Sequence, residues 1–577
     1  MLTGILFPII LLALGGGIVY TIVQRRDETV DRGAAVRRLY FYLVALISYI
    51  TALFGLDGIL RTLADVWLGE KSLYTINDER YIREQLARTA GFLLVATLIF
   101  LLHWGYVQQR RQRPGEAGSA LRKLFLYVGL GFTVGFALAI GYQLLSGIVD
   151  LAFGLPLSQS TIWPSQWLYL SAMLLACFGL IAYLNRTLHG DGDYGQESNR
   201  AAALWRRLYL LVACLVGITI TLWGVTSLLS VIIESILDQL STVLSISAGG
   251  TPSWSGPITQ LILGTILLRL HWSMWQSLLT ATATRTNELN SAVRRLYLYG
   301  AVVIGALFAL IGSAMILDAF LLRAFGSTSD SLLDIIRGNR MALAAIGPGA
   351  IAWRLYWLQL HRESERYGES RQGVEVRRVY YYAVAATGLA LLWIGAGTLV
   401  QVVLDWLMSG DLLGQGLWRE PLAHGLSMLA VGAPVWSLHW QAVQPIARQN
   451  NEAGAEERSA LPRRIYLYGV ALIGALVILF FLAQVVYRFF LMILGDTESS
   501  FFSPQTANEI AQSLIAAALW GVHMLALRTD MRMGGPTEPD KSSDRRAELE
   551  ARISRLETEL AAAKEELAKI ENGELGE

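Results

Sequence analysis

The sequence predicts an all-α, multi-pass transmembrane bundle of about thirteen helices, followed by a C-terminal cytoplasmic coiled-coil helix. Three observations lead to this prediction: an apolar composition, a short basic and aromatic motif that recurs six times, and an apolar heptad pattern near the C-terminus. Of the 577 residues, 54% are hydrophobic and 16% are charged, whereas soluble domains contain about 25% charged residues. The composition therefore excludes a disordered chain and a small secreted domain held by disulfides.

Charge and cysteine content give no support to a nucleic-acid partner or a cofactor. Lys and Arg number 47 and Asp and Glu number 46, so the chain has no basic excess that would attract nucleic acid. Cys177 and Cys214 lie in apolar runs without a C-x-x-C pattern, which is typical of small buried hydrophobic residues. We therefore expect neither a nucleic-acid partner nor a cofactor.

The N-terminal segment, residues 1–24, is a predicted transmembrane helix. It is apolar, Arg25 and Arg26 follow it, and no basic residue precedes it. A cleavable signal peptide has the opposite order of charge. We expect the segment to be retained, with the N-terminus outside.

A six-residue motif, here called the basic box, opens with two basic residues, an aliphatic residue and an aromatic residue. The first copy reads Arg37-Arg38-Leu39-Tyr40-Phe41-Tyr42, and successive copies start 85, 84, 88, 83 and 86 residues apart. The basic pairs of the six boxes are Arg37 and Arg38, Arg122 and Lys123, Arg206 and Arg207, Arg294 and Arg295, Arg377 and Arg378, and Arg463 and Arg464. This even spacing predicts an internal repeat.

Each repeat contains two apolar runs long enough to cross a hydrocarbon core of about 30 Å. The first run follows the basic box, and the second ends near Leu-His-Trp or a related sequence. The predicted repeats cover residues 37–107, 122–185, 206–279, 294–360, 377–443 and 463–528, and a polar linker over residues 529–544 follows them. Two helices per repeat and the N-terminal helix together give about thirteen spans.

The repeats alternate in character. His-Trp closes the second helix of the first, third and fifth repeats, and in these an acidic residue falls 28 positions after the first Arg of the box, at Asp65, Glu234 and Asp405. Among the even repeats only the second has this acid, at Asp150. The alternation predicts a larger unit of four helices and about 170 residues, present three times.

The distribution of basic residues predicts the orientation. Segments that precede the boxes, with the boxes included, contain 26 Lys and Arg residues, whereas the loops inside the repeats contain 10. Because positive residues favour the cytoplasmic side, the boxes and the C-terminus are expected inside. The expected location is the plasma (inner) membrane.

Residues 545–571 carry apolar side chains alternately four and three positions apart, which predicts a coiled coil. The seam consists of Leu549, Ile553, Leu556, Leu560, Leu567 and Ile570, with Ala563 as a thin layer. This segment predicts a homo-oligomer or a separate coiled-coil partner, and a lone solvated helix is the alternative.

The repeated R-R-L-Y-x-Y motif, with an acid near the end of the following helix, resembles a bacterial family of multi-pass membrane proteins catalogued as a domain of unknown function. The resemblance covers residues 37 to about 528. It implies a helical membrane fold and carries no activity, substrate or catalytic residue.

Candidate sites are few. The twelve basic residues of the boxes are candidates for binding lipid headgroups, and simple anchoring at the interface is the alternative. Asp57 and Asp318 lie within apolar runs and are candidates for an intramembrane polar site. Arg61 is the candidate ion-pair partner of Asp57, and Arg323 is that of Asp318. His103, His271, His439 and His523 end second helices, and a haem or metal would require them to converge.

The sequence favours a non-enzymatic membrane scaffold or assembly component. No nucleotide-binding or hydrolase motif occurs in it, and its loops are short. The alternative function is a transporter or channel for an ion or small solute, suggested by Asp57, Asp318 and the sequences Gly347-Pro348-Gly349 and Gly432-Ala433-Pro434. These last two would be substrate sites if they break their helices, but the sequence favours an ordinary kink or a packing contact.

Overall fold

The computed structural model describes residues 32–68, 78–113, 115–154, 164–192, 194–197, 199–243, 253–280, 282–409, 416–495 and 501–534. These residues form helices joined by turns, and no strand occurs among them. The predicted all-α class is therefore confirmed for this part of the chain. The predicted N-terminal helix, residues 1–24, and the predicted coiled coil, residues 545–571, lie outside the described residues.

Twelve helices of 26 to 44 residues make up most of the described chain. They are α2 (Arg32–Leu68), α3 (Asp78–Gln109), α4 (Ala120–Ala152), α5 (Pro164–Gly190), α6 (Arg200–Val243), α7 (Ser255–Thr280), α9 (Ala292–Ala324), α11 (Arg340–Tyr367), α12 (Arg371–Ser409), α14 (Arg419–Ala447), α16 (Leu461–Ile493) and α17 (Pro504–Met533). Each range predicted as a repeat contains most of two of these helices.

Nine of the described helices are long and apolar enough to cross a membrane. They are α2, α3, α4, α5, α6, α9, α12, α16 and α17. The chain thus has the helices of a membrane-spanning protein, as its composition predicts. The number of about thirteen spans stays a prediction.

Three short helices connect the long ones: α8 (Thr282–Leu289), α10 (Leu332–Gly338) and α15 (Glu452–Ser459). Helix α15 begins where the Asn451 side chain accepts a hydrogen bond from the Gly454 backbone N–H at 2.9 Å. Helix α10 begins with a reciprocal capping box between Ser331 and Asp334, and the hydrogen bonds from Ser331 lower the pKa of Asp334. Helices α8 and α15 each lie directly before a basic box, where they position acidic side chains.

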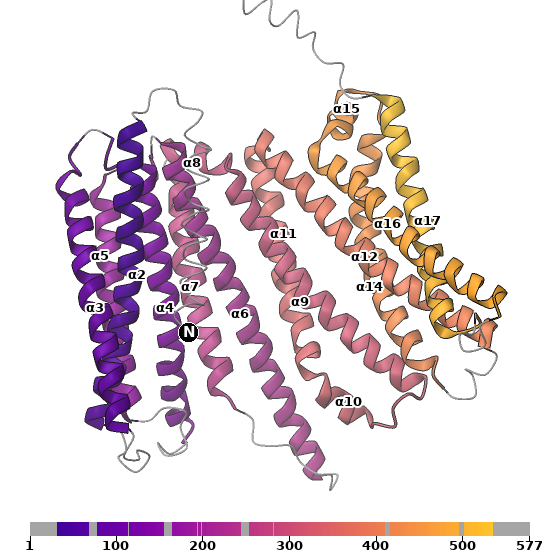
Figure 1. Ribbon diagram of the computed structural model, residues 1–577, viewed down its shortest axis with the longest axis horizontal. Coiled ribbons are helices and arrows are strands. Elements are labelled where there is room, and N and C mark those ends of the chain that lie inside the picture. The colour runs from indigo at the N-terminus through magenta and orange to yellow at the C-terminus, as the bar shows by residue number, and fades with distance from the viewer. Residues whose placement is uncertain are drawn as a thin grey trace, which may run out of the picture. The chain divides into compact units, whose positions relative to one another are not determined.

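The described residues divide into two compact units. The first comprises those up to Phe320 together with residues 329–377, and the second comprises residues 321–328 together with those from Arg378 onward. In the first unit α2 packs against α3, α4 and α5, and α4 also packs against α6 and α7 (Figure 1). In the second unit α16 packs against α17, and a core around Tyr382, Trp440, Tyr466 and Leu467 joins α12, α14, α16 and α17.

Glycine lies where paired helices approach most closely. A Cβ on Gly264 of α7 would be 2.5 Å from the backbone nitrogen of Thr221 in α6. A Cβ on Gly349 of α11 would be equally close, 2.5 Å, to the backbone nitrogen of Ala309 in α9. Because no larger residue fits at such a contact, these glycines allow the backbones to touch.

The two Gly/Pro sequences lie inside continuous helices. Helix α11 runs through Pro348, and α14 runs through Pro434. Gly432 of α14 packs against α12, where its Cβ would be 2.5 Å from the Leu392 nitrogen. Neither sequence breaks its helix, so the alternative of a substrate site at a helix break is wrong, and Gly349 and Gly432 are packing contacts.

Candidate functional site

In each even repeat the first Arg of the basic box is buried against a carboxylate that lies two to six residues after the predicted end of that repeat. The ion pairs are Arg122 with Asp191, Arg294 with Glu363, and Arg463 with Asp530. Arg122 donates from Nε and Nη2 to the two oxygens of Asp191 at 2.9 and 3.0 Å, and both side chains are fully buried. Because each carboxylate lies at or just after the C-terminal part of the second helix, the pair joins the two helices of the repeat.

In each odd repeat the box instead binds a glutamate that belongs to the approach to the next repeat. These pairs are Arg38 with Glu116, Arg206 and Arg207 with Glu288, and Arg378 with Glu457. Each glutamate lies six residues before the first basic residue of the following even box. The ion pairs therefore connect the first repeat to the second, the third to the fourth, and the fifth to the sixth.

Glu288 of α8 shows the electrostatics of these sites. It accepts hydrogen bonds from Arg206 at 2.8 Å, Arg207 at 3.0 Å and the Trp275 indole at 3.1 Å. Burial raises the pKa of Glu288, but the positive charges of Arg206 and Arg207 outweigh it, so that the pKa lies below the ordinary glutamate value. Glu288 is therefore ionised at neutral pH and neutralises two buried or half-buried guanidinium groups.

The Trp of the Leu-His-Trp motif contacts the arginine of the following box. The guanidinium carbon of Arg122 lies 5.3 Å from the Trp104 ring centre. The same contact joins Arg294 to Trp272 at 5.2 Å and Arg463 to Trp440 at 5.6 Å. These cation–π contacts attach each odd repeat to the following even repeat a second time.

The His of the same motif, and His523 of the sixth repeat, pair with the box Tyr of their own repeats. The Nδ1 atoms of His103, His271 and His439 each lie 2.8 Å from the backbone carbonyl four residues earlier. A carbonyl can only accept, so we assign the proton to Nδ1, and Nε2 of the neutral ring then accepts from the Tyr hydroxyl. The distances are 3.3 Å for Tyr40 with His103, 2.7 Å for Tyr209 with His271, 3.3 Å for Tyr380 with His439 and 2.9 Å for Tyr466 with His523.

These pairs place the four histidines on different helices, α3, α7, α14 and α17. Among the described residues, no group of three His, Cys, Asp or Glu side chains lies close enough together to hold a metal ion. Cys177 and Cys214 are free and buried, as their sequence context predicts. In the described part of the chain, each of the four histidines thus pairs with a tyrosine of its own repeat and belongs to no such group.

Burial corrects the lipid-anchoring prediction for half of the box residues. Arg122, Lys123, Arg206, Arg294, Arg295 and Arg463 are buried. Their cationic groups contact protein atoms, as for Lys123 with Asp191 at 3.4 Å and Arg295 with the Ser364 hydroxyl at 2.9 Å. Arg38, Arg207, Arg377 and Arg378 are half-buried and form ion pairs, and headgroup binding stays a prediction for the exposed Arg37 and Arg464.

Asp57 lies in a polar cluster between α2 and α5. The Tyr169 hydroxyl donates to the Asp57 carboxylate, and Arg61 Nη2 lies 2.9 Å from the Tyr169 hydroxyl and 3.6 Å from Asp57. The predicted pairing of Asp57 with Arg61 is thus confirmed. Asp57 follows Arg37 by 20 residues, and this is about 30 Å along a helix, close to the full thickness of a hydrocarbon core. With the box at one edge of the membrane, as the sequence predicts, the cluster would lie near the opposite edge rather than at the centre.

The other acidic candidates lie outside the cluster of Asp57, Arg61 and Tyr169. Asp318 is half-buried on α9, whereas the contacts described for Asp57 involve α2 and α5. Glu234 of α6 binds Arg340 of α11 at 3.1 Å, and Asp405 accepts from Gln401 at 3.5 Å. The oligomerisation seam from Leu549 to Ile570 lies outside the described residues.

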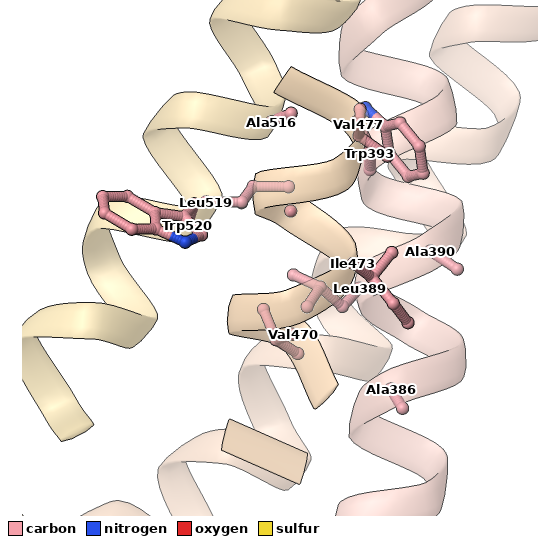
Figure 2. Close-up of a pocket in the computed structure, with 11 residues that line it drawn as sticks. Ala386, Leu389, Ala390, Trp393, Val470, Ile473, Val477, Ala516, Leu519 and Trp520 are labelled. Carbon is pink, nitrogen blue, oxygen red and sulfur yellow. The ribbon is translucent and has the colours of Figure 1, made fainter. Parts of the chain in front are cut away.

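Three cavities in the described chain are apolar. Figure 2 shows one of about 170 Å³ in the second unit, between Leu389 and Trp393 of α12, Ile473 of α16, and Leu519 and Trp520 of α17. A cavity of about 560 Å³ lies between α4, α5 and α7, and one of about 250 Å³ lies between α2 and α3. None of these three is lined by Asp57, Asp318 or residues 347–349.

Sequence reasoning missed the acidic partners of the boxes. The signal was present, because Glu116, Glu288 and Glu457 stand at the same distance from successive even boxes. A periodic acid beside a periodic Arg indicates an ion pair, whereas either pattern alone does not.

The family comparison reproduces the division into units of four helices. The model described as "Domain of unknown function (DUF5671)" matches residues 38–178, 207–351 and 378–522. Each match begins at the second basic residue of an odd box, which confirms a repeated unit that is present three times. No curated protein and no solved structure matches the chain. Because the matched residues make up more than half of its length, the chain belongs to the DUF5671 family, a domain of unknown function.

Proposed function

We propose that the chain is a non-enzymatic integral membrane protein that acts as a scaffold or assembly component. One observation carries this proposal: the charged residues that recur with the repeat bind one another. Arg206, for example, is neutralised by both Glu197 and Glu288 at 2.7 and 2.8 Å. Buried charges that bind one another are costly to separate and leave few polar groups for chemistry.

The proposal includes a location and a partner. The bias of basic residues supports placement in an inner membrane with the boxes and the C-terminus in the cytoplasm. The predicted coiled coil over residues 545–571 then projects into the cytoplasm and joins this chain to a second copy. Tethering to the membrane raises the local concentration of such segments, so a seam of three heptads is sufficient.

Crosslinking through the C-terminal segment tests this proposal. A Leu549→Cys reporter in native membranes should give a disulfide-linked dimer, because the native Cys177 and Cys214 are both buried and do not compete. Adding Leu556→Asp and Leu560→Asp should abolish the dimer, since each large apolar side chain buried in the seam contributes about 1.5–3 kcal/mol.

The control places the same charges outside the seam, as Ser554→Asp with Thr558→Asp, and should leave the dimer intact. Membrane insertion should be equal in all variants. A reporter that never yields a dimer, although the protein is inserted, would remove the homo-oligomer from the proposal.

The cluster of Asp57, Arg61 and Tyr169 favours a transporter or channel as the second candidate. Proteoliposomes that hold a pH-sensitive dye under a potassium gradient would show proton flux if Asp57 lies on a conduction path. Under the scaffold proposal, flux should equal that of empty liposomes. Flux that is lost in Asp57→Asn and kept in Asp65→Asn, a half-buried acid of the same helix, would replace the scaffold by a transporter.

A further inference from the structure

The largest of the three cavities lies within the first unit and has about 560 Å³. This volume is in the range of pockets that bind small molecules. Its walls are apolar and include Val134, Leu138 and Leu145 of α4, Phe178 of α5, and Ile266 of α7. None of the residues in the box ion pairs lines this cavity. Tyr209 and His271, which pair with each other, line one end of it.

The cavity is long and opens sideways. Its wall on α4 extends from Leu130 to Ile148, which is about 27 Å along the helix and close to the thickness of a hydrocarbon core. Three of its lining side chains are about half exposed, namely Phe178 at 56%, Ile266 at 50% and Leu270 at 57%. Helices α4 and α5 are long and apolar enough to cross a membrane, and in a bilayer this opening faces the lipid acyl region.

One end of the cavity is polar, and this is the end nearest the basic boxes. Asn185, Tyr209, His271 and Ser273 line it. The Tyr209 hydroxyl donates to His271, and the Ser273 hydroxyl donates to the Leu270 carbonyl at 2.8 Å. Asn185 is half-buried and makes no side-chain hydrogen bond to any described residue, and the adjacent Arg186 is exposed.

The dimensions exclude a helix as the occupant. A helix with its side chains is at least about 10 Å wide, so a 27 Å length of it fills roughly 2,000 Å³. This is several times the volume of the cavity, so neither the N-terminal segment nor a helix from a second copy fits inside. A single acyl chain is a thin, flexible apolar rod that does fit.

We propose that this cavity binds one acyl chain of a phospholipid, with the headgroup phosphate at Asn185 and Arg186. The chain lies along α4 between α5 and α7, where it covers apolar surface that would otherwise be a void. The amide of Asn185 donates to a phosphate oxygen, and Arg186 supplies the opposite charge. This site does not depend on the proposed scaffold function, because no residue of the C-terminal segment takes part in it.

Photolabelling of the full chain tests the site. Vesicles of phosphatidylcholine would contain a small share of phosphatidylglycerol with a photoactivatable group in one acyl chain, and adducts would be mapped to peptides after irradiation. We expect labelling of α4 and α7 well above that of Leu476 and Leu479 on α16, which are exposed and report bulk lipid. Labelling of α4 and α7 no stronger than that of α16 would overturn the proposal.

Filling the cavity should remove the excess label. A Cβ on Gly141 would be 3.9 Å from Leu263 and 4.0 Å from Leu174, so Gly141→Leu extends into the cavity without a backbone clash. Gly135 of the same helix is exposed and has nothing within 4 Å, which makes Gly135→Leu the matched control. Leu138→Trp, at a half-buried lining position, serves as a second filling variant in case Gly141→Leu does not fold. Full labelling in a folded filling variant would also overturn the site.

Comparing a lipid that has a phosphate with one that lacks it tests the headgroup contact. Photoactivatable diacylglycerol, which has no phosphate, should label the wild-type cavity less than phosphatidylglycerol does. The double variant Asn185→Leu with Arg186→Gln should lower phosphatidylglycerol labelling to the diacylglycerol level. Equal labelling by both lipids in the wild type would contradict the assignment of the phosphate to Asn185 and Arg186.

Discussion

Replacing Asp191 by alanine should lower the free energy of unfolding by about 3–5 kcal/mol, because buried positive charge is left without its counter-charge. The Asp191 carboxylate lies 2.9 Å from Arg122, 3.0 Å from Arg111 and 3.4 Å from Lys123. The side chains of Arg122 and Lys123 are almost completely buried, so water cannot replace the lost carboxylate. Denaturant titration of the purified protein in one detergent would measure the change.

An exposed ion pair provides the comparison for Asp191. Glu84 binds Arg80 at 3.0 Å, but both side chains are largely exposed, at 57% and 88%. Glu84→Ala should therefore cost no more than about 1 kcal/mol, since water and salt screen such pairs. If Asp191→Ala were as mild as Glu84→Ala, the ion pair of the even box would not hold the two helices of its repeat together.

The second large effect is expected at Gly349, where even one methyl group should destabilise the protein by about 1–3 kcal/mol. Its Cβ would lie 2.5 Å from the Ala309 nitrogen and 2.8 Å from the Gly305 carbonyl oxygen. These are backbone atoms of α9, which cannot rotate away as a side chain does. Gly349→Ala therefore has to push α9 and α11 apart, and thermal unfolding in detergent would report the loss.

Gly347 lies two residues away on the same helix and has nothing within 4 Å of a Cβ. Gly347→Ala should be neutral or stabilising by up to about 1 kcal/mol, because alanine favours the helix more than glycine does. The pair of variants also separates the two interpretations of the Gly-Pro-Gly sequence. Helix packing predicts that only position 349 is sensitive, whereas equal damage at both positions would contradict that explanation.

Several parts of the fold were predictable because their signals are local. Apolar runs of sufficient length mark helices wherever they occur, and the hexamer at even spacing marks the repeat. The alternation of Leu-His-Trp with other endings predicted the larger unit, and the three family matches confirm it. The pairing of Asp57 with Arg61 was also predictable, since the two residues are one helical turn apart.

The role of the boxes was not predictable in the same way. Arg122 and Arg37 open similar hexamers, but the structure buries the first and exposes the second. A basic residue near the end of an apolar run is compatible with lipid headgroups and with a buried carboxylate alike. The two outcomes differ only in whether an acidic side chain from elsewhere in the chain reaches the same place.

Composition and periodicity were thus enough to establish a helical membrane protein made of repeated pairs of helices, because length and apolarity act within each segment. Only the tertiary structure determined which acidic side chain pairs with which arginine. Asp191 stands 69 residues from Arg122, and Glu288 stands 82 residues from Arg206. Tertiary structure also decides the requirement for glycine at position 349, because the backbone of α9 leaves no room for a side chain there. Contacts of this kind depend on which helices pack side by side, and helix packing is settled by the shapes of several segments at once.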